Sequence, residues 1–266
     1  MLENVNLKRK LSREEYKSAV PAVQQRLYDL EKACWDHGIP TIVLFEGWDA
    51  SGKGTAIAAL TQRLDPRGFK LYPITAPRTY EQQRPWLWRF WLKVPNRGEM
   101  VIFDRSWYLR VLDERVDRVV PEKAWRDAYR DIVEFERMLA DDGTVILKFF
   151  LHISKKEQKE RFRAIEADPL EAWRVTAADW ARQKQYPQYL AAVEEMLELT
   201  ESEFAPWTIV EATSKWYARR KIFETIVNAM ERKLGADAPP RVAIPAAVAK
   251  DAELRAAMES LAEERI

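Results

Sequence analysis

The stretch FEGWDASGKGT, residues 45–55, has the residue types and spacing of a phosphate-binding loop. Gly47 and Gly52 are separated by four residues, and Lys53 follows the second glycine directly. Such glycines let backbone N–H groups turn towards a phosphate, and the lysine supplies a mobile positive charge. We therefore predict that this loop binds the phosphate groups of a ligand. The residues predicted to contact them, besides Lys53, are Gly47, Ala50, Ser51, Gly52, Gly54 and Thr55.

Gly54 occupies the position at which such loops usually carry the serine or threonine that binds magnesium. A replacement ligand, Asp49, lies inside the loop, and a second carboxylate, Asp104, follows the apolar run MVIF. Asp104 thus lies at the carboxyl end of a predicted strand, and ligands bind at the carboxyl ends of the strands in open parallel sheets. Because magnesium prefers one or two carboxylates with phosphate oxygens and water, we predict Mg²⁺, or Mn²⁺ in its place, at Asp49 and Asp104. The alternatives are a turn-forming Asp49 and a helix-capping Asp104.

Two groups of basic residues accompany these carboxylates. Arg105, Arg110 and Arg115 follow at intervals of five, and a helix would spread them over about 280°. Some of the three are therefore expected to line a cleft and others are not. A second group surrounds Arg161, with Arg174 further along the chain, and forms the expected lid of the site. That run is equally compatible with a solvated helix face balanced by acidic neighbours.

Five apolar runs, each separated from the next by helical patterns, are predicted to form a buried parallel sheet. The runs cover residues 41–45, 70–76, 100–103, 144–153 and 207–212. A helical arm precedes them: Ser12 and Glu15 have the spacing of a capping box, and Gly38 and Pro40 end the helix. Pro21 is expected to kink or split this arm.

Whole-chain properties narrow the class of protein. A chain of 266 residues with 47% hydrophobic residues is long enough for one α/β domain with a large core. A net charge of +1 gives no general attraction to nucleic acid or to an anionic membrane, so neither is expected as a partner. One cysteine excludes an internal disulfide, and no run approaches 18 apolar residues. We expect a cytoplasmic protein.

The ordered series of motifs resembles the polyphosphate kinase family 2 from about residue 12 to residue 234. The resemblance is carried by FEGWDASGKGT, APRTYEQ, WLWRFW, VIFDRSWYLRVLDERV, FFLHISKKEQKERF, DPLEAWRVT, YLAAVEEMLELT and APWTIVEATSKWYARRKIF. It implies a P-loop kinase-like fold of three layers, in which about five parallel strands are flanked by helices and a helical lid covers the site. The domain boundaries expected from it are an N-terminal arm at 1–40, a kinase domain at 41–235 with a lid at about 154–182, and a C-terminal appendage at 236–266.

The same resemblance implies magnesium-dependent phosphoryl transfer between inorganic polyphosphate and a nucleotide. The transfer would convert AMP into ADP, or it would convert ADP into ATP and GDP into GTP. By position, Asp49 and Asp104 match the metal-binding aspartates, and Lys53 matches the loop lysine. Together with Arg105 they form the predicted catalytic set. Arg110 and Arg115 match basic residues on the polyphosphate path, and we predict the same role for Arg161 and Arg174 on the lid.

Several positions depart from the family pattern. Thr55 stands where many members have glycine, Leu109 where asparagine or glycine is common, and Asp113 where valine is frequent. The subgroup that accepts both nucleoside mono- and diphosphates tends to have Asp after the loop lysine and Asn at the strand end. With Gly54 and Asp104 in these places, the chain is more similar to the other subgroups, which leaves the choice between AMP and ADP or GDP open.

Two other functions remain open from the sequence. An ATP-dependent nucleoside monophosphate kinase has a similar loop but normally keeps serine or threonine after the lysine. A non-catalytic sensor of nucleotides or polyanions would not need both Asp49 and Asp104, because carboxylates repel phosphate unless a metal intervenes. The apolar positions of the arm are equally compatible with core packing and with a homodimer or homotetramer.

Overall fold

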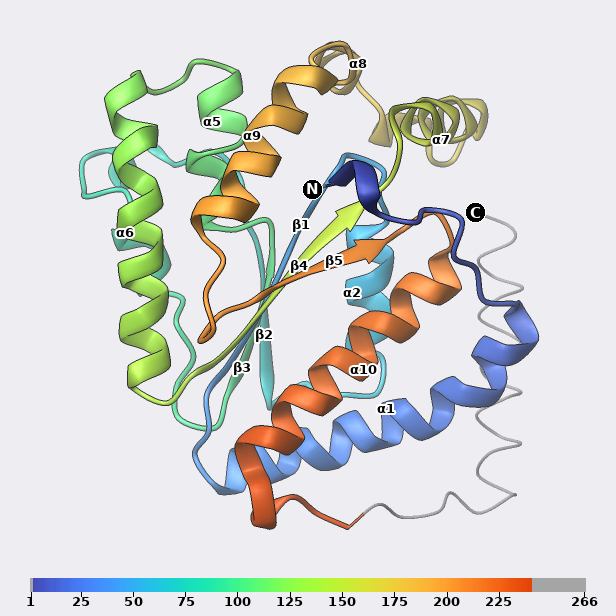
Figure 1. The fold of residues 1–266 in the computed structure, drawn as a ribbon, viewed down its shortest axis with the longest axis vertical. Helices are drawn as coiled ribbons and strands as arrows, with labels where there is room; N and C mark the ends of the chain where they lie inside the picture. Colours follow the sequence, from blue (N-terminus) through green and yellow to red (C-terminus); the bar gives the residue numbers. More distant parts are fainter. Residues whose placement is uncertain (1, 241–266) are drawn as a thin grey trace.

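A five-stranded parallel sheet forms the centre of the protein, of which the computed structural model describes residues 2–240 (Figure 1). The strands are β1 (Thr41–Gly47), β2 (Phe69–Pro73), β3 (Met100–Asp104), β4 (Val145–His152) and β5 (Trp207–Glu211). Their order across the sheet is β2-β3-β1-β4-β5, and every neighbouring pair is parallel. Each strand overlaps the apolar run predicted for it, so the predicted α/β class is confirmed.

The central strands are buried on both faces. Ile42, Val43, Leu44 and Phe45 of β1 are all 0% exposed, as expected of a parallel strand with helices on either side. This burial explains why the run TIVLF shows no alternation of apolar and polar residues. The edge strand β2, in contrast, has no fully buried residue.

Helices cover both faces of the sheet (Figure 1). On one face lie α1 (Arg13–Asp36), α2 (Lys53–Thr61) and α10 (Lys215–Leu234), and on the other lie α6 (Glu122–Asp141) and α9 (Tyr186–Leu199). Shorter helices occupy the connections and the two ends of the described chain. They are α3 (Thr79–Gln82), α4 (Trp88–Trp91), α5 (Asp113–Val116) and the 3-10 segments Leu2–Asn4, Trp107–Arg110 and Gly235–Asp237.

The predicted N-terminal arm is α1, which packs along α10 (Figure 1). Its capping box is confirmed: the Ser12 side chain accepts from the Glu15 backbone N–H, and the Glu15 side chain accepts from the Ser12 backbone. Pro21 lies inside one continuous helix, so the chain is not split there. Proline removes only one helical hydrogen bond, and the burial of side chains such as Leu27 and Leu30 in the core holds the helix together.

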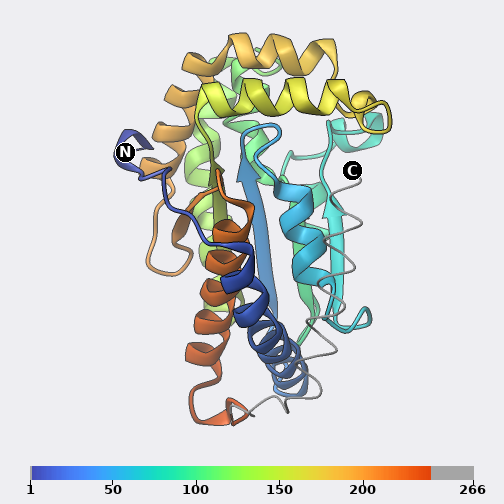
Figure 2. The same ribbon diagram turned by 90° about the vertical axis from the view of Figure 1, so that its right-hand side faces the viewer.

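The helices of the predicted lid lie beyond the carboxyl ends of the strands. They are α7 (Lys155–Ala167), the 3-10 segment Ala172–Arg174 and α8 (Ala177–Lys184), and Figure 2 shows them across the top of the molecule. Among residues 2–240, no helix is long and apolar enough to cross a membrane. Most of the C-terminal appendage predicted at 236–266 falls outside the described residues.

Candidate active site

The predicted phosphate-binding loop connects β1 to α2. Gly47 ends β1 with φ of 142°, and a Cβ atom there would lie 2.5 Å from the backbone oxygen of Leu151 on β4. Only glycine therefore fits between these two strands. Gly52 has φ of 97° and is the N-cap of α2, which begins at Lys53. The loop thus brings the N-terminus of a nine-residue helix to the carboxyl edge of the sheet, where it favours anions.

The two predicted metal-binding carboxylates lie at the same edge. Phe45 of β1 pairs with Asp104 of β3, so Asp104 comes directly beside the start of the loop that carries Asp49. Both aspartates line a hollow of about 620 Å³ together with Lys53 and Arg105. The remaining predicted residues that line it are Ala50, Ser51, Gly52, Gly54, Thr55, Arg161 and Arg174.

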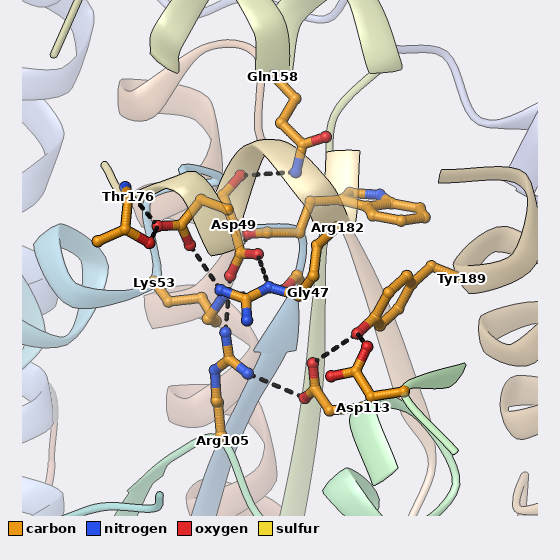
Figure 3. A network of polar contacts seen from close by, with 12 residues as sticks. Gly47, Asp49, Lys53, Arg105, Asp113, Gln158, Thr176, Arg182 and Tyr189 are labelled. Carbon is orange, nitrogen blue, oxygen red and sulfur yellow. Dashed lines mark hydrogen bonds and ion pairs between the residues drawn. The ribbon is translucent and has the colours of Figure 1, made fainter. Parts of the chain in front are cut away.

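Asp49 is the centre of a network of ion pairs (Figure 3). Its Oδ1 atom accepts a hydrogen bond of 2.7 Å from Arg105, and its Oδ2 atom accepts one of 2.9 Å from Arg182 on α8. Burial alone would raise the pKa of Asp49, but the positive charges of Lys53, Arg105 and Arg182 hold it below its usual value. Asp49 is therefore ionised at neutral pH, and each of its oxygens is bound by one arginine.

Lys53 folds back over the loop, where its ammonium group donates to the backbone oxygens of Gly47 at 2.8 Å and Trp48 at 3.1 Å. Burial and the neighbouring Arg105 lower the pKa of Lys53. A negatively charged phosphate in the hollow would oppose this shift, because it favours the protonated lysine. Next to the loop, burial raises the pKa of Glu46 to about 7, although Ser106 donates to its carboxylate at 2.7 Å.

The lid helices contact the loop directly. Gln158 on α7 donates to the backbone oxygen of Asp49 at 3.2 Å, and Arg161 donates to that of Ala50 at 3.0 Å. Arg161 also donates to the backbone oxygens of Ala212 and Thr213 after β5. The lid therefore forms part of the wall of the hollow, to which it contributes Arg161 and Arg174.

Arg110 and Arg115 do not line this hollow, whereas Arg105 does, so only one of the three arginines predicted along the polyphosphate path lies in its wall. Arg110 pairs with Glu114 at 3.0 Å and lines a separate hollow of about 340 Å³. Arg115 donates to Glu195 at 2.8 Å and lies over the ring of Trp125. The chain turns through a 3-10 segment and α5 after Arg105, so the three arginines point to different surroundings.

A family model described as polyphosphate kinase 2 matches residues 10–237. The chain belongs to the polyphosphate kinase 2 family. The structure of polyphosphate kinase 2 from Arthrobacter aurescens TC1 is similar with a TM-score of 0.85 and 29% identity, and the match covers 96% of this chain and 93% of that one. The P-loop kinase-like fold expected from the sequence is thereby confirmed.

Curated relatives carry more specific names. The chain is 41% identical over 239 residues to the polyphosphate:AMP phosphotransferase of Pseudomonas syringae pv. tomato, covering 89% of this chain and 48% of that protein. It is 36% identical over 214 residues to the AMP/ADP-polyphosphate phosphotransferase of Meiothermus ruber, covering 80% of each. The chain thus spans about half the length of the Pseudomonas relative and most of the Meiothermus relative.

The residues of this polyphosphate kinase 2 family member fit a hard divalent cation. Asp49 and Asp104 offer carboxylate oxygens on one wall of the hollow, and a Cβ added at Gly54 would meet nothing within 4 Å. No group of three or more His, Cys, Asp or Glu residues suited to a metal occurs in residues 2–240. Magnesium needs only one or two carboxylates when phosphate oxygens and water complete its shell, so this donor set suits a metal that arrives with phosphate.

Sequence reasoning missed several residues of the site. Arg182 on α8 binds Asp49, and Asp113 accepts from Arg105 at 2.9 Å. Lys215 and Arg219 at the start of α10 line the hollow. Arg182 lies at the last position of the expected lid and belongs to none of the motifs that carried the resemblance. Lys215 and Arg219 lie in the motif APWTIVEATSKWYARRKIF, which supported the family resemblance but had no role assigned to its basic residues.

Proposed function

We propose that this protein transfers a phosphoryl group between inorganic polyphosphate and a nucleotide, with Mg²⁺ as cofactor. The observation that carries the proposal is the hollow over the loop, where basic side chains surround two carboxylates in a chain of the polyphosphate kinase 2 family. The basic side chains are Lys53, Arg105, Arg161, Arg174, Lys215 and Arg219. Such an excess of positive charge suits a ligand with several consecutive phosphates.

Direct transfer requires positioning and charge neutralisation, and it requires no side-chain nucleophile. The loop N–H groups and Lys53 hold the phosphates, and Arg105 offers a guanidinium to the phosphoryl group. Bound Mg²⁺, held by Asp49 and Asp104, would neutralise charge on the phosphate oxygens. Because Arg105 and Arg182 now occupy both oxygens of Asp49, an arriving phosphate group competes with Asp49 for their guanidiniums.

The preferred acceptor is proposed to be AMP, and a nucleoside diphosphate is proposed as a less favoured acceptor. The names of the relatives support this order, since the Pseudomonas syringae protein is a polyphosphate:AMP phosphotransferase and the Meiothermus ruber protein an AMP/ADP-polyphosphate phosphotransferase. The lid also fixes the loop that an acceptor would meet, since Gln158 and Arg161 donate to the backbone oxygens of Asp49 and Ala50.

The test is a set of initial rates with long-chain polyphosphate and Mg²⁺, using AMP, ADP and GDP in turn as acceptor. Formation of the nucleotide with one more phosphate is expected for AMP at least. ATP with AMP, without polyphosphate, serves as the comparison. If ATP is the better donor, the chain is a nucleoside monophosphate kinase. If polyphosphate binds without any turnover, the chain is a sensor, and the proposal is wrong in either case.

A further inference from the structure

The guanidinium of Arg105 is shared between two carboxylates that come from different elements (Figure 3). One terminal nitrogen donates to Asp49 in the loop at 2.7 Å, and the other donates to Asp113 at 2.9 Å. Arg105 has φ of 62°, a left-handed conformation that is uncommon for a residue with a side chain. The backbone turn and the two carboxylates together fix the direction of this side chain.

The two carboxylates bind different nitrogens of Arg105 and differ in whether they border the hollow. Asp49 lines the hollow of about 620 Å³, whereas Asp113 is not among the residues of its wall. Asp113 lines a small cavity of about 40 Å³ with Tyr189 and Arg182, and Asp49 and Arg105 line this cavity as well. A water molecule needs at least 10–15 Å³ by the same measure, so this cavity admits a few waters and excludes a nucleotide or a phosphate chain. Asp113 is therefore absent from the wall of the hollow, and its hydrogen bond to Arg105 joins it to a residue of that wall.

Asp113 is itself held from behind by α9. The hydroxyl of Tyr189 donates to the Oδ1 atom of Asp113 at 3.1 Å and lies 3.4 Å from Asp117. Burial and the two carboxylates raise the pKa of Tyr189, so its hydroxyl keeps its proton and remains a donor. One hydroxyl has one proton to donate, and the shorter contact is the one to Asp113. Asp113 is also a position at which this chain departs from the common family pattern.

We propose that Asp113, held by Tyr189, is a positioning residue for Arg105. When a phosphoryl group takes the place of Asp49, one nitrogen of Arg105 turns to that group while the other stays on Asp113. The guanidinium then keeps the orientation that it needs for transfer, since only one of its two anchors has been exchanged. The role in transfer rests on the proposed function, whereas the anchoring of Arg105 does not.

The first experiment compares kcat and KM of Asp113→Val, Asp113→Asn and Tyr189→Phe, using long-chain polyphosphate and saturating AMP. Asp113→Val should lower kcat by about tenfold or more, the range seen when residues that orient a functional group are lost. Asp113→Asn should lose less, because its side-chain oxygen still accepts from Arg105, and Tyr189→Phe least. KM for polyphosphate should stay the same or fall, since a negative charge near the polyanion has been removed. Unchanged kcat in Asp113→Val overturns the proposal.

A matched control and a double variant separate positioning from a general disturbance. Asp117→Asn removes a charge beside the same tyrosine without touching Arg105, and its kcat should stay close to that of the wild type. In an Arg105→Ala background, Asp113→Val should cause no further loss, because residues that act through one another are not additive. An equal loss in both backgrounds would contradict the assigned role.

A second measurement does not depend on turnover. Crystal structures of the wild type and of Asp113→Val should show an ordered Arg105 guanidinium in the first and a displaced or disordered one in the second. If the wild type shows no polyphosphate-dependent turnover, the proposed function fails, and these two structures still decide whether Asp113 anchors Arg105. An unmoved guanidinium in the variant would overturn the inference.

Discussion

Two networks of charged residues in this protein contain ion pairs of similar length, but one borders an open hollow and the other is fully buried. At the carboxyl edge of the sheet, Arg105, Arg182 and Asp49 form ion pairs beside an open hollow (Figure 3). On the face of the sheet that α6 and α9 cover, Lys148 on β4 and Glu136 on α6 form an ion pair at 2.8 Å, and both side chains are 0% exposed. The first network faces the candidate active site, and the second is enclosed by protein on all sides.

The enclosed pair is satisfied entirely by its neighbours. The ammonium group of Lys148 donates to Glu136, to the hydroxyl of Tyr108 and to the backbone oxygen of Thr200. Glu136 also accepts from Trp107 at 3.0 Å and from Tyr108 at 2.8 Å. All three ammonium donors are thus used, and no other ion can enter. The pairs around Asp49 can exchange partners with a ligand, so the comparison separates a structural network from one suited to binding.

Breaking the enclosed pair tests this comparison with the largest expected effect. Lys148→Met should lower the free energy of unfolding by about 3–5 kcal/mol, because it leaves the carboxylate of Glu136 buried without its cation. Urea unfolding followed by fluorescence measures the loss. The protein that remains folded should keep its kcat, because Lys148 is not among the residues that line the hollow.

The double variant Lys148→Met with Glu136→Leu is the control. Replacing both charges by apolar groups should recover much of the stability, since no unpaired charge remains buried. A double variant as unstable as the single one would show that the pair stabilises the fold by more than mutual neutralisation. A loss of kcat without a loss of stability would remove the distinction between the two networks.

The sequence was sufficient to predict the sheet and the loop, because both depend on local patterns. Five apolar runs became five strands, and the Gly47 to Lys53 spacing became a strand, a loop and the start of a helix. The partners of Lys148 could not be predicted, because Glu136 and Thr200 meet it only after folding. The same is true of Arg182, which reaches Asp49 across 133 positions of the chain. The partner of Arg115 could not be predicted either, because its direction depends on α5, a four-residue helix without a strong periodic signal.

The second prediction concerns the open network. Asp49→Asn and Asp104→Asn should each lower kcat by about 10² or more, the cost of losing one preorganised electrostatic group at a reacting centre. Stability should change little compared with Lys148→Met, since Asp49 borders a hollow that water can enter. Rates at saturating substrate and Mg²⁺, together with unfolding curves, measure both quantities.

Gly54→Ser provides a further check on the same carboxylates. A side chain at this position would meet nothing within 4 Å, so the serine should fit. It restores the hydroxyl that such loops usually offer to magnesium, yet it should not fully rescue Asp49→Asn, because a neutral hydroxyl does not replace a carboxylate. Near-normal magnesium-dependent rates in Asp49→Asn alone would show that the loop carboxylate is not a metal ligand.

The smallest expected effect separates arginines of the hollow from arginines outside it. Arg174 lines the hollow and pairs with Glu171, whereas Arg115 pairs with Glu195 outside it, so the two form a matched pair of the same residue type. A polymer with many charges releases counterions at each contact, as nucleic acids do, so its KM should rise with salt. Arg174→Gln should raise KM for long polyphosphate more than for tripolyphosphate and lower the slope of log KM against log salt by about 0.7. Arg115→Gln should leave that slope unchanged. An equal change in both variants would show that Arg115 also contacts polyphosphate, as predicted from the sequence.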